Sequence, residues 1–284
     1  MPHLALPPLG WLRDFPDLRD FSTDHENVKA LRTGGNRARL VRPSVVNLEE
    51  HFAHAAKEPV FAGCSAQSCC ALVEYFERRA HGRAFVGSAL FLHTMTCRLL
   101  HQNCEGGTPL RATFKALKRF GLPPNEYWPA TREHFLAEPG AFLFAYAREY
   151  TDLVYVRLDS LQREGARLLV TVKAFVAAGF PVAFGFSMFD SLSEDPRVPF
   201  PSVFDRSIGG RSAVAAGYDD DVRVRSERGA LRIRGSWGSE WGEAGYGWLP
   251  YRYVVDHLAT DFWTLLRPDW LAKGELQLPR AALL

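Results

Sequence analysis

The fold of this chain is decided by the stretch Phe61-Ala62-Gly63-Cys64-Ser65-Ala66-Gln67-Ser68-Cys69-Cys70-Ala71-Leu72-Val73-Glu74-Tyr75-Phe76. A short glycine turn precedes Cys64, and the apolar residues after it recur with helical spacing. This spacing predicts a helix from Cys64 to about Ala80 with one buried face. A cysteine at a helix N-terminus feels the positive end of the helix dipole, which favours the thiolate. The stretch therefore predicts a nucleophilic cysteine at the head of a helix.

Length and composition are those of an ordinary globular protein. With 284 residues, 47% of them hydrophobic, the chain can bury a large core in one domain or two lobes. The formal net charge is +2 and the two signs are interspersed, which argues against nucleic acid as a partner. The N-terminal segment lacks the basic and long apolar regions of a signal peptide, and no apolar run reaches the ~18 residues of a membrane helix. We therefore expect a cytoplasmic protein without a membrane partner.

The five cysteines form a poor disulfide framework, because their number is odd, two are adjacent and three share one predicted helix. They predict no disulfides and a reducing compartment. Cys69 and Cys70 are expected to be small core residues.

Two clusters of metal-ligand residue types are present, and neither predicts a metal site. His93, Cys97, His101 and Cys104 follow one face of a predicted helix, but such a run spans about 16 Å and cannot converge on one ion. The run Asp219-Asp220-Asp221 reads as a solvated turn between two strands. We expect neither a metal nor another cofactor.

The chain changes character near its middle. Residues 1–45 read as an extended arm, with a helical turn near His25–Leu31, and most of the segment up to residue 150 reads as helical. After residue 150, short strand patterns separated by turns dominate, with one helix over 168–178. This order indicates an α+β protein of two lobes. The predicted helices before residue 150 cover 64–80, 88–102, 110–120 and 141–149, and the predicted strands cover 153–158, 181–187, 212–218, 222–225, 230–234 and 246–249.

Several stretches together resemble the papain family of cysteine peptidases. They are Gly63-Cys64-Ser65-Ala66, Cys104-Glu105-Gly106-Gly107, Ile208-Gly209-Gly210-Arg211-Ser212-Ala213-Val214, and Gly235-Ser236-Trp237-Gly238-Ser239-Glu240-Trp241-Gly242-Glu243-Ala244-Gly245-Tyr246-Gly247. The bacterial branch without an inhibitory pro-domain is the most similar, on Val46-Asn47-Leu48-Glu49 and Phe184-Gly185-Phe186.

This resemblance implies an α+β, papain-like two-lobed fold. A helical lobe carrying Cys64 would cover 46–150, and an antiparallel, β-barrel-like lobe would cover 151–266. An N-terminal arm of residues 1–45 would precede them, and a tail of 267–284 would pack back on the body. Gly63, Gly106, Gly107 and Trp237 would line the cleft between the lobes.

Only one of the family's four catalytic positions keeps its residue. Cys64 matches the nucleophile, but Arg211 stands at the histidine position and Gly235 at the asparagine position. Glu58 stands at the position of the oxyanion glutamine. An arginine cannot accept the thiol proton, and glycine has no side chain with which to orient a base. A carboxylate would repel the oxyanion that the glutamine stabilises.

The replaced residues suggest how the former site is closed. Glu58 and Arg211 would face each other from opposite lobes, and we expect them to pair directly or through water. Two alternatives are that Arg211 faces an anionic ligand, or that it holds Cys64 as a thiolate.

The function that follows is that of a catalytically degenerate pseudopeptidase, which binds a peptide, a protein or a small ligand without hydrolysing it. One alternative is a cysteine acyltransferase using Cys64, because acyl transfer from a thioester needs less protonation of the leaving group than amide hydrolysis. Another is a residual cysteine peptidase with an unidentified base.

Overall fold

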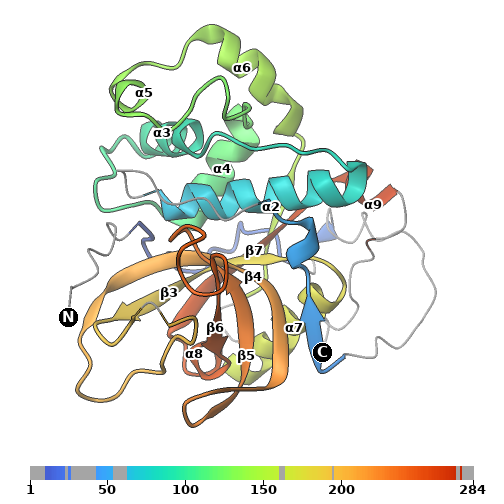
Figure 1. Cartoon of the computed structure of the whole chain (residues 1–284). Coiled ribbons are helices and arrows are strands. Elements are labelled where there is room, and N and C mark those ends of the chain that lie inside the picture. The colour runs from blue at the N-terminus through green and yellow to red at the C-terminus, as the bar shows by residue number, and fades with distance from the viewer. Residues whose placement is uncertain are drawn as a thin grey trace.

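The computed structural model describes residues 10–22, 25–26, 43–53, 63–159, 164–193, 195–272 and 276. Helix α2 (Cys64–His81) runs across the middle of the molecule, with the other helices of the first half on one side and the sheet on the other (Figure 1). A single hydrophobic core extends through both lobes and includes α2. The α+β, two-lobed architecture expected from the sequence is confirmed.

The helical lobe contains α3 (Ala89–Leu100), α4 (Leu110–Phe120), α5 (Arg132–Leu136) and α6 (Ala141–Ala147), followed by a short 3-10 turn at Arg148–Tyr150. Helix α4 ends as predicted at Gly121, whose φ of 76° lies in the region that glycine adopts without a steric penalty. The predicted helices of this half are thus confirmed to within a few residues at their ends.

In the described residues, seven strands form one antiparallel sheet. Its main path runs in the order β2-β7-β3-β4-β5-β6, and β1 adds to β4 outside that path. Helices α7 (Gly165–Ala177) and α8 (Arg252–Val255) belong to this half of the chain, and a 3-10 turn at Glu49–His51 follows β1. The strands are β1 (Val45–Asn47), β2 (Val154–Arg157), β3 (Val182–Phe189), β4 (Ser207–Val224), β5 (Glu227–Arg234), β6 (Tyr246–Pro250) and β7 (Ala259–Leu266).

Strand β4 corrects one prediction. The expected break at Asp219-Asp220-Asp221 is absent, because the strand runs on through these residues with only a register shift against β5. Lys173 and the Tyr251 hydroxyl both contact the Asp220 carboxylate, which places this acidic run against α7 and the end of β6. The run is therefore part of the sheet and not a solvated turn.

Two further features were not predicted. Strand β7 lies between β2 and β3, and every one of its residues is buried. Helix α2 was expected to bury one face, but it is buried on nearly all sides because α3, α4, β4 and the short helix α9 (Pro268–Ala272) surround it.

The two ends of the described chain pack against the body. Of the predicted tail, the described helix α9 packs on the body, since Trp270 stacks on Phe76 with ring centroids 4.7 Å apart. Within the expected arm, residues 10–16 are extended and residues 17–20 form a turn, and Trp11 and Leu12 hydrogen-bond to opposite lobes. The helical turn predicted near His25–Leu31 falls mostly outside the described residues.

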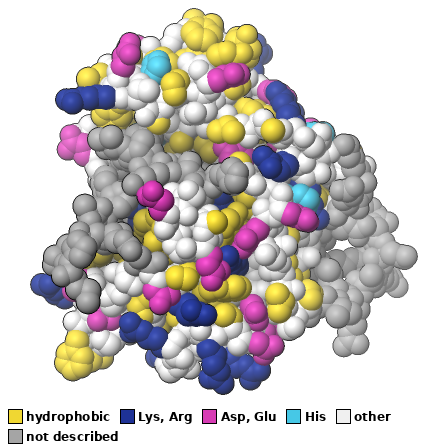
Figure 2. Space-filling view, viewed as in Figure 1, with side chains coloured by type: hydrophobic (Ala, Val, Ile, Leu, Met, Phe, Trp, Pro, Cys, Tyr) yellow, Lys and Arg dark blue, Asp and Glu magenta, His cyan; other side chains and the backbone are white. Residues whose placement is uncertain are grey.

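Charges of both signs are interspersed on the face shown in Figure 2, in keeping with the balanced composition. No helix in the described part of the chain is long and apolar enough to cross a membrane.

Candidate functional site

Cys64 is the first residue of α2, as predicted, and Gly63 is the N-cap. The exposed fraction of Cys64 is 0%. The backbone N–H of Ser212, on β4, donates a hydrogen bond to Cys64 Sγ at 3.4 Å. The Ser68 and Ser212 hydroxyls, 2.8 Å apart, form a second link between α2 and β4. The thiol is thus enclosed where the helical lobe meets the sheet.

Arg211 lies next to Ser212 on β4 and is among the largest fully buried side chains, with an exposed fraction of 0%. Its Nη2 donates to Ser236 Oγ at 2.8 Å. Its guanidinium carbon lies 5.1 Å from the centroid of the Trp237 ring, which is the geometry of a cation–π contact. Arg211 is therefore held by a hydroxyl and an aromatic face on the loop that follows β5.

Gly235 leaves room for the neighbouring indole. A Cβ at this position would lie 1.8 Å from Trp237 Cε3, so the tryptophan ring fills the space that a side chain at 235 would need. Trp237 in turn contacts Trp241, with ring centroids 4.2 Å apart. Both indoles are buried.

The Gly106-Gly107 segment meets the N-terminal arm. A Cβ on Gly107, whose φ is 100°, would lie 2.3 Å from the Gly10 carbonyl carbon, whereas a Cβ on Gly106 would meet nothing within 4 Å. The Ser65 hydroxyl donates to the Thr108 carbonyl at 2.7 Å and lies 3.3 Å from the Gly10 carbonyl. The arm therefore passes directly beside the residue that follows Cys64.

The structure brings Cys64, Arg211, Gly235 and Trp237 into one region through Ser212 and Ser236. Glu58 lies outside the described residues, so its pairing with Arg211 stays a prediction. Trp11 of the arm, which packs on Gly185 and Gly210 of the same sheet, was not predicted. No periodicity marks Trp11, and its contacts lie far away in the sequence.

The cysteine and histidine cluster lies on α3 and the turn that follows it. His93 Nε2 and Cys97 Sγ lie 3.5 Å apart, but no group of three or more ligand-type residues that could hold an ion occurs among the described residues. Burial lowers the pKa of His93 to about 4. None of the five cysteines forms a disulfide, and Cys69 and Cys70 are buried as predicted.

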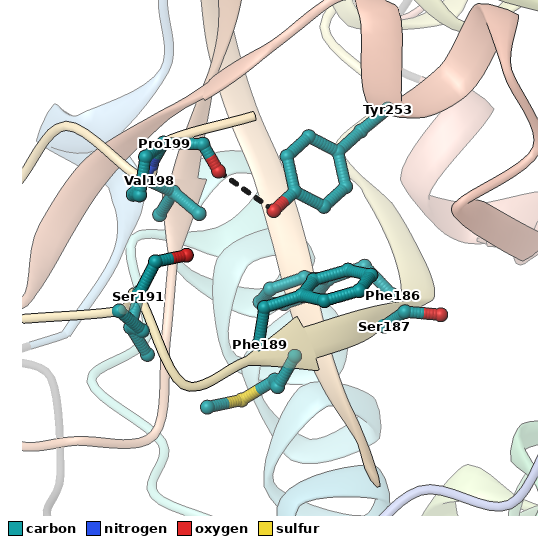
Figure 3. Close-up of a pocket in the computed structure, with 9 residues that line it drawn as sticks. Phe186, Ser187, Phe189, Ser191, Val198, Pro199 and Tyr253 are labelled. Carbon is teal, nitrogen blue, oxygen red and sulfur yellow. Dashed lines mark hydrogen bonds between the residues drawn. The ribbon is translucent and has the colours of Figure 1, made fainter. Parts of the chain in front are cut away.

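A small pocket lies on β3, beside the strand partner of Arg211. Phe186, which pairs with Arg211 in the sheet, lines it, and the lining side chains leave no room for a water molecule. Figure 3 shows that the Tyr253 hydroxyl closes one side by donating to the Pro199 carbonyl at 2.9 Å. The pocket is lined mostly by apolar side chains and carries no charged group.

The comparisons with known proteins agree with this architecture. The chain is similar to the crystal structure of xylellain, a cysteine protease from Xylella fastidiosa, with 27% identity, a TM-score of 0.73, and coverage of 92% of this chain and 97% of that one. It is also similar to an uncharacterized peptidase C1-like protein, L477, of Acanthamoeba polyphaga mimivirus, with 24% identity over 273 residues that cover 90% of this chain and 86% of that protein.

More distant structures share the fold alone. Procathepsin L 3 from the Tenebrio molitor larval midgut is 17% identical, with a TM-score of 0.60 and coverage of 84% of this chain and 74% of that one. No protein-family profile matches the chain. The resemblance to papain-like cysteine peptidases inferred from the sequence is confirmed by these likenesses.

Proposed function

Taking the chain as a homologue of the papain-like cysteine peptidases, we propose that it binds a peptide, a protein segment or a small ligand in its cleft without hydrolysing it. The observation that carries this proposal is the burial of Arg211, at the position that the resemblance gives to the catalytic histidine. Peptide hydrolysis needs a group that takes the thiol proton and returns it to the leaving amine, and such a group contributes roughly 10²–10⁴ in rate. An arginine side chain stays protonated and cannot do this.

The surroundings of Arg211 support a structural role for its charge. The guanidinium donates to Ser236 Oγ and lies over the Trp237 ring, so this part of the cleft is packed around it. A catalytic imidazole would have to occupy the same volume and would need an orienting partner. The Trp237 ring fills the space in which a side chain at 235 would stand.

The burial of Cys64 also supports binding without hydrolysis. Its thiol has no exposed surface, and the arm passes beside the next residue along the helix. The two alternatives, acyl transfer through Cys64 and residual peptidase activity, both need a substrate carbonyl within bonding distance of Sγ. Either would require the arm and the packed residues around Sγ to move.

Labelling and turnover test the proposal. We expect purified full-length protein to show no hydrolysis of fluorogenic peptides, and Cys64 to escape modification by an epoxide inhibitor of papain-type cysteines at neutral pH. Mass spectrometry of the intact protein and of the Cys64→Ala variant separates labelling at Cys64 from labelling at the partly exposed Cys97. A turnover that disappears in Cys64→Ala would overturn the proposal.

A further inference from the structure

Four cationic side chains on the surface of the helical lobe form no ion pair with any carboxylate among the described residues. They are Lys115, Lys118 and Arg119 on α4 and Arg148 directly after α6. Only Lys118 is half-buried, and its Nζ lies 5.5 Å from the centroid of the Phe21 ring, whereas the other three side chains are exposed. Their charges are therefore not neutralised within the described part of the chain.

The acidic residues that follow Arg148 most closely in the sequence are already paired with other arginines. Glu149 binds Arg83 at 2.6 Å, and Asp152 binds Arg267 at 3.1 Å. Acidic side chains are thus present nearby in the sequence, but their charges are used at other contacts. The four cations form a positive surface in a chain whose overall charge is almost balanced.

The helix dipole accounts for only part of this pattern. Cations in the last turn of a helix are favoured by its dipole, and this covers Lys118 and Arg119. Lys115 lies in the middle of α4, one turn before Arg119, and like charges at this spacing destabilise a helix. The arrangement therefore costs stability, and a bound anion would offset this cost.

The four cations line two pockets that share Arg119. The volumes of the pockets are about 540 Å³ and about 290 Å³. Neither lining includes an acidic residue or any residue of the candidate functional site. The first pocket is lined by Arg119, Phe120, Phe144, Ala145, Arg148 and Thr151, and the second by Leu99, Lys115, Lys118 and Arg119.

The first pocket has a preformed apolar wall. The ring centroid of Phe144 lies 5.3 Å from that of the buried Phe91 and 6.5 Å from that of Phe120. Side chains that are already held in place lose little conformational freedom when a ligand binds. The guanidinium groups of Arg119 and Arg148 lie beside this wall, and each can bind a carboxylate through two parallel hydrogen bonds. The pocket therefore suits a ligand that carries an apolar group next to carboxylates.

We propose that this surface binds an acidic segment of a partner protein, which places an apolar side chain in the first pocket and carboxylates on the surrounding cations. Charge complementarity of this kind selects partners and speeds their association. The chain does not supply the segment itself, because each stretch outside the described residues holds at most one acidic residue. An inorganic polyanion would leave the apolar wall without a partner. The inference goes beyond the proposed function, since it involves no residue of the cleft.

The experiment measures fluorescence polarisation of a labelled peptide of about eight residues, all glutamate except for one central phenylalanine, titrated with the full-length protein. We expect saturable binding, and Arg119→Gln combined with Arg148→Gln should raise Kd at least about tenfold. Arg223→Gln combined with Arg228→Gln is the matched control, because it removes the same charge from exposed positions on β4 and β5. This control should change Kd by less than about twofold, and circular dichroism checks that each variant is folded.

Changes in the peptide test the recognition chemistry without altering the protein. Glutamine in place of glutamate should raise Kd at least about tenfold, and serine in place of the phenylalanine at least about fivefold. A single-stranded oligonucleotide of equal charge should displace the labelled peptide at least about tenfold less effectively than the unlabelled peptide does, because it lacks the apolar side chain.

The proposal is overturned if the protein shows no saturable binding, or if the two double variants have equal Kd values. It is also overturned if the oligonucleotide competes as well as the peptide. The outcome is independent of the proposed function: Cys64→Ala should bind the acidic peptide with the same Kd as the intact protein, whether or not the intact protein hydrolyses other peptides.

Discussion

The two sides of the cleft are built differently. The helical side presents small groups, which are Gly63 before the helix, the Cys64 thiol and the open Gly106 position. The sheet side presents a buried guanidinium and two packed indoles. In a papain-like site the nucleophile comes from the first side and its base from the second. Cys64 therefore lies on the helical side, whereas Arg211 and Gly235, at the positions that the resemblance gives to the histidine and the asparagine, lie on the sheet side.

The largest effect is expected on the sheet side, at Arg211. Changing Arg211→Ala removes a large buried side chain and leaves a cavity against Trp237 and Ser236, so the free energy of unfolding should fall by about 3–5 kcal/mol. Urea unfolding followed by tryptophan fluorescence measures it. Arg206→Ala is the control, because the Arg206 side chain is 88% exposed, and it should change stability by no more than about 0.5 kcal/mol. Equal losses of unfolding free energy in Arg211→Ala and Arg206→Ala would show that the buried Arg211 side chain does not stabilise the sheet side.

Adding a side chain at Gly235 should also damage the sheet side. Gly235→Asn must displace the Trp237 ring, so we expect a loss of about 1–3 kcal/mol. The matched change on the helical side is Gly106→Asn, where a Cβ meets nothing within 4 Å, and it should cost much less.

A double-mutant cycle sharpens this comparison. If Trp237 is the obstacle, combining Gly235→Asn with Trp237→Ala should cost less than the sum of the two single changes. If the two losses of stability simply add, the Trp237 ring is not what prevents a side chain at position 235.

Asp261 makes the sheet side pH-dependent. Burial raises the pKa of Asp261 to about 7, above its usual value of 3.8, so the folded state holds a proton that the unfolded chain has released. Its stabilising contribution is complete below pH 3.8 and is lost as the pH rises to about 7, with a slope of at most about 1.4 kcal/mol per pH unit. Asp261→Asn, which suits the residue's φ of 64°, should flatten the stability profile across this window. An unchanged profile would exclude Asp261 as the titrating group.

The smallest effect is expected at the bond between the two sides. Ser68→Ala leaves the Ser212 hydroxyl buried without its 2.8 Å partner and should cost about 1 kcal/mol in thermal or urea unfolding. Ser239→Ala, at an exposed position, is the control and should be neutral. A neutral Ser68→Ala would show that this bond does not stabilise the contact between the lobes.

Local patterns were enough to predict the longer helices α2, α3, α4 and α7 and the position of Cys64, but not the short helices α5, α8 and α9. Helix α4 combines a proline before its first turn with a glycine at its end, and these signals act within a few residues. The glycine turn before Cys64 works at the same short range. Such features depend on neighbours in the sequence and can be read without the fold.

The missed features depend on distant contacts. Strand β7 is buried on both faces and is interrupted by Asp261 in a left-handed conformation, so it shows none of the alternation that marks a half-buried strand. The pocket that holds Trp11 is formed by Gly185 and Gly210, which only the folded sheet brings together. The sequence of the arm alone therefore gives no indication of that pocket.

Helix α2 is held at both ends by the two ends of the described chain. The Gly10 carbonyl meets Ser65 in its first turn, and Trp270 stacks on Phe76 and donates to Glu77 Oε1 at 3.0 Å near its last turn. If the two chain ends were pulled apart, the force would therefore load the contacts at the two ends of α2 first. The contacts between the lobes would be loaded later. In a single-molecule pulling experiment, the arm and the tail would be the first mechanical elements to give way.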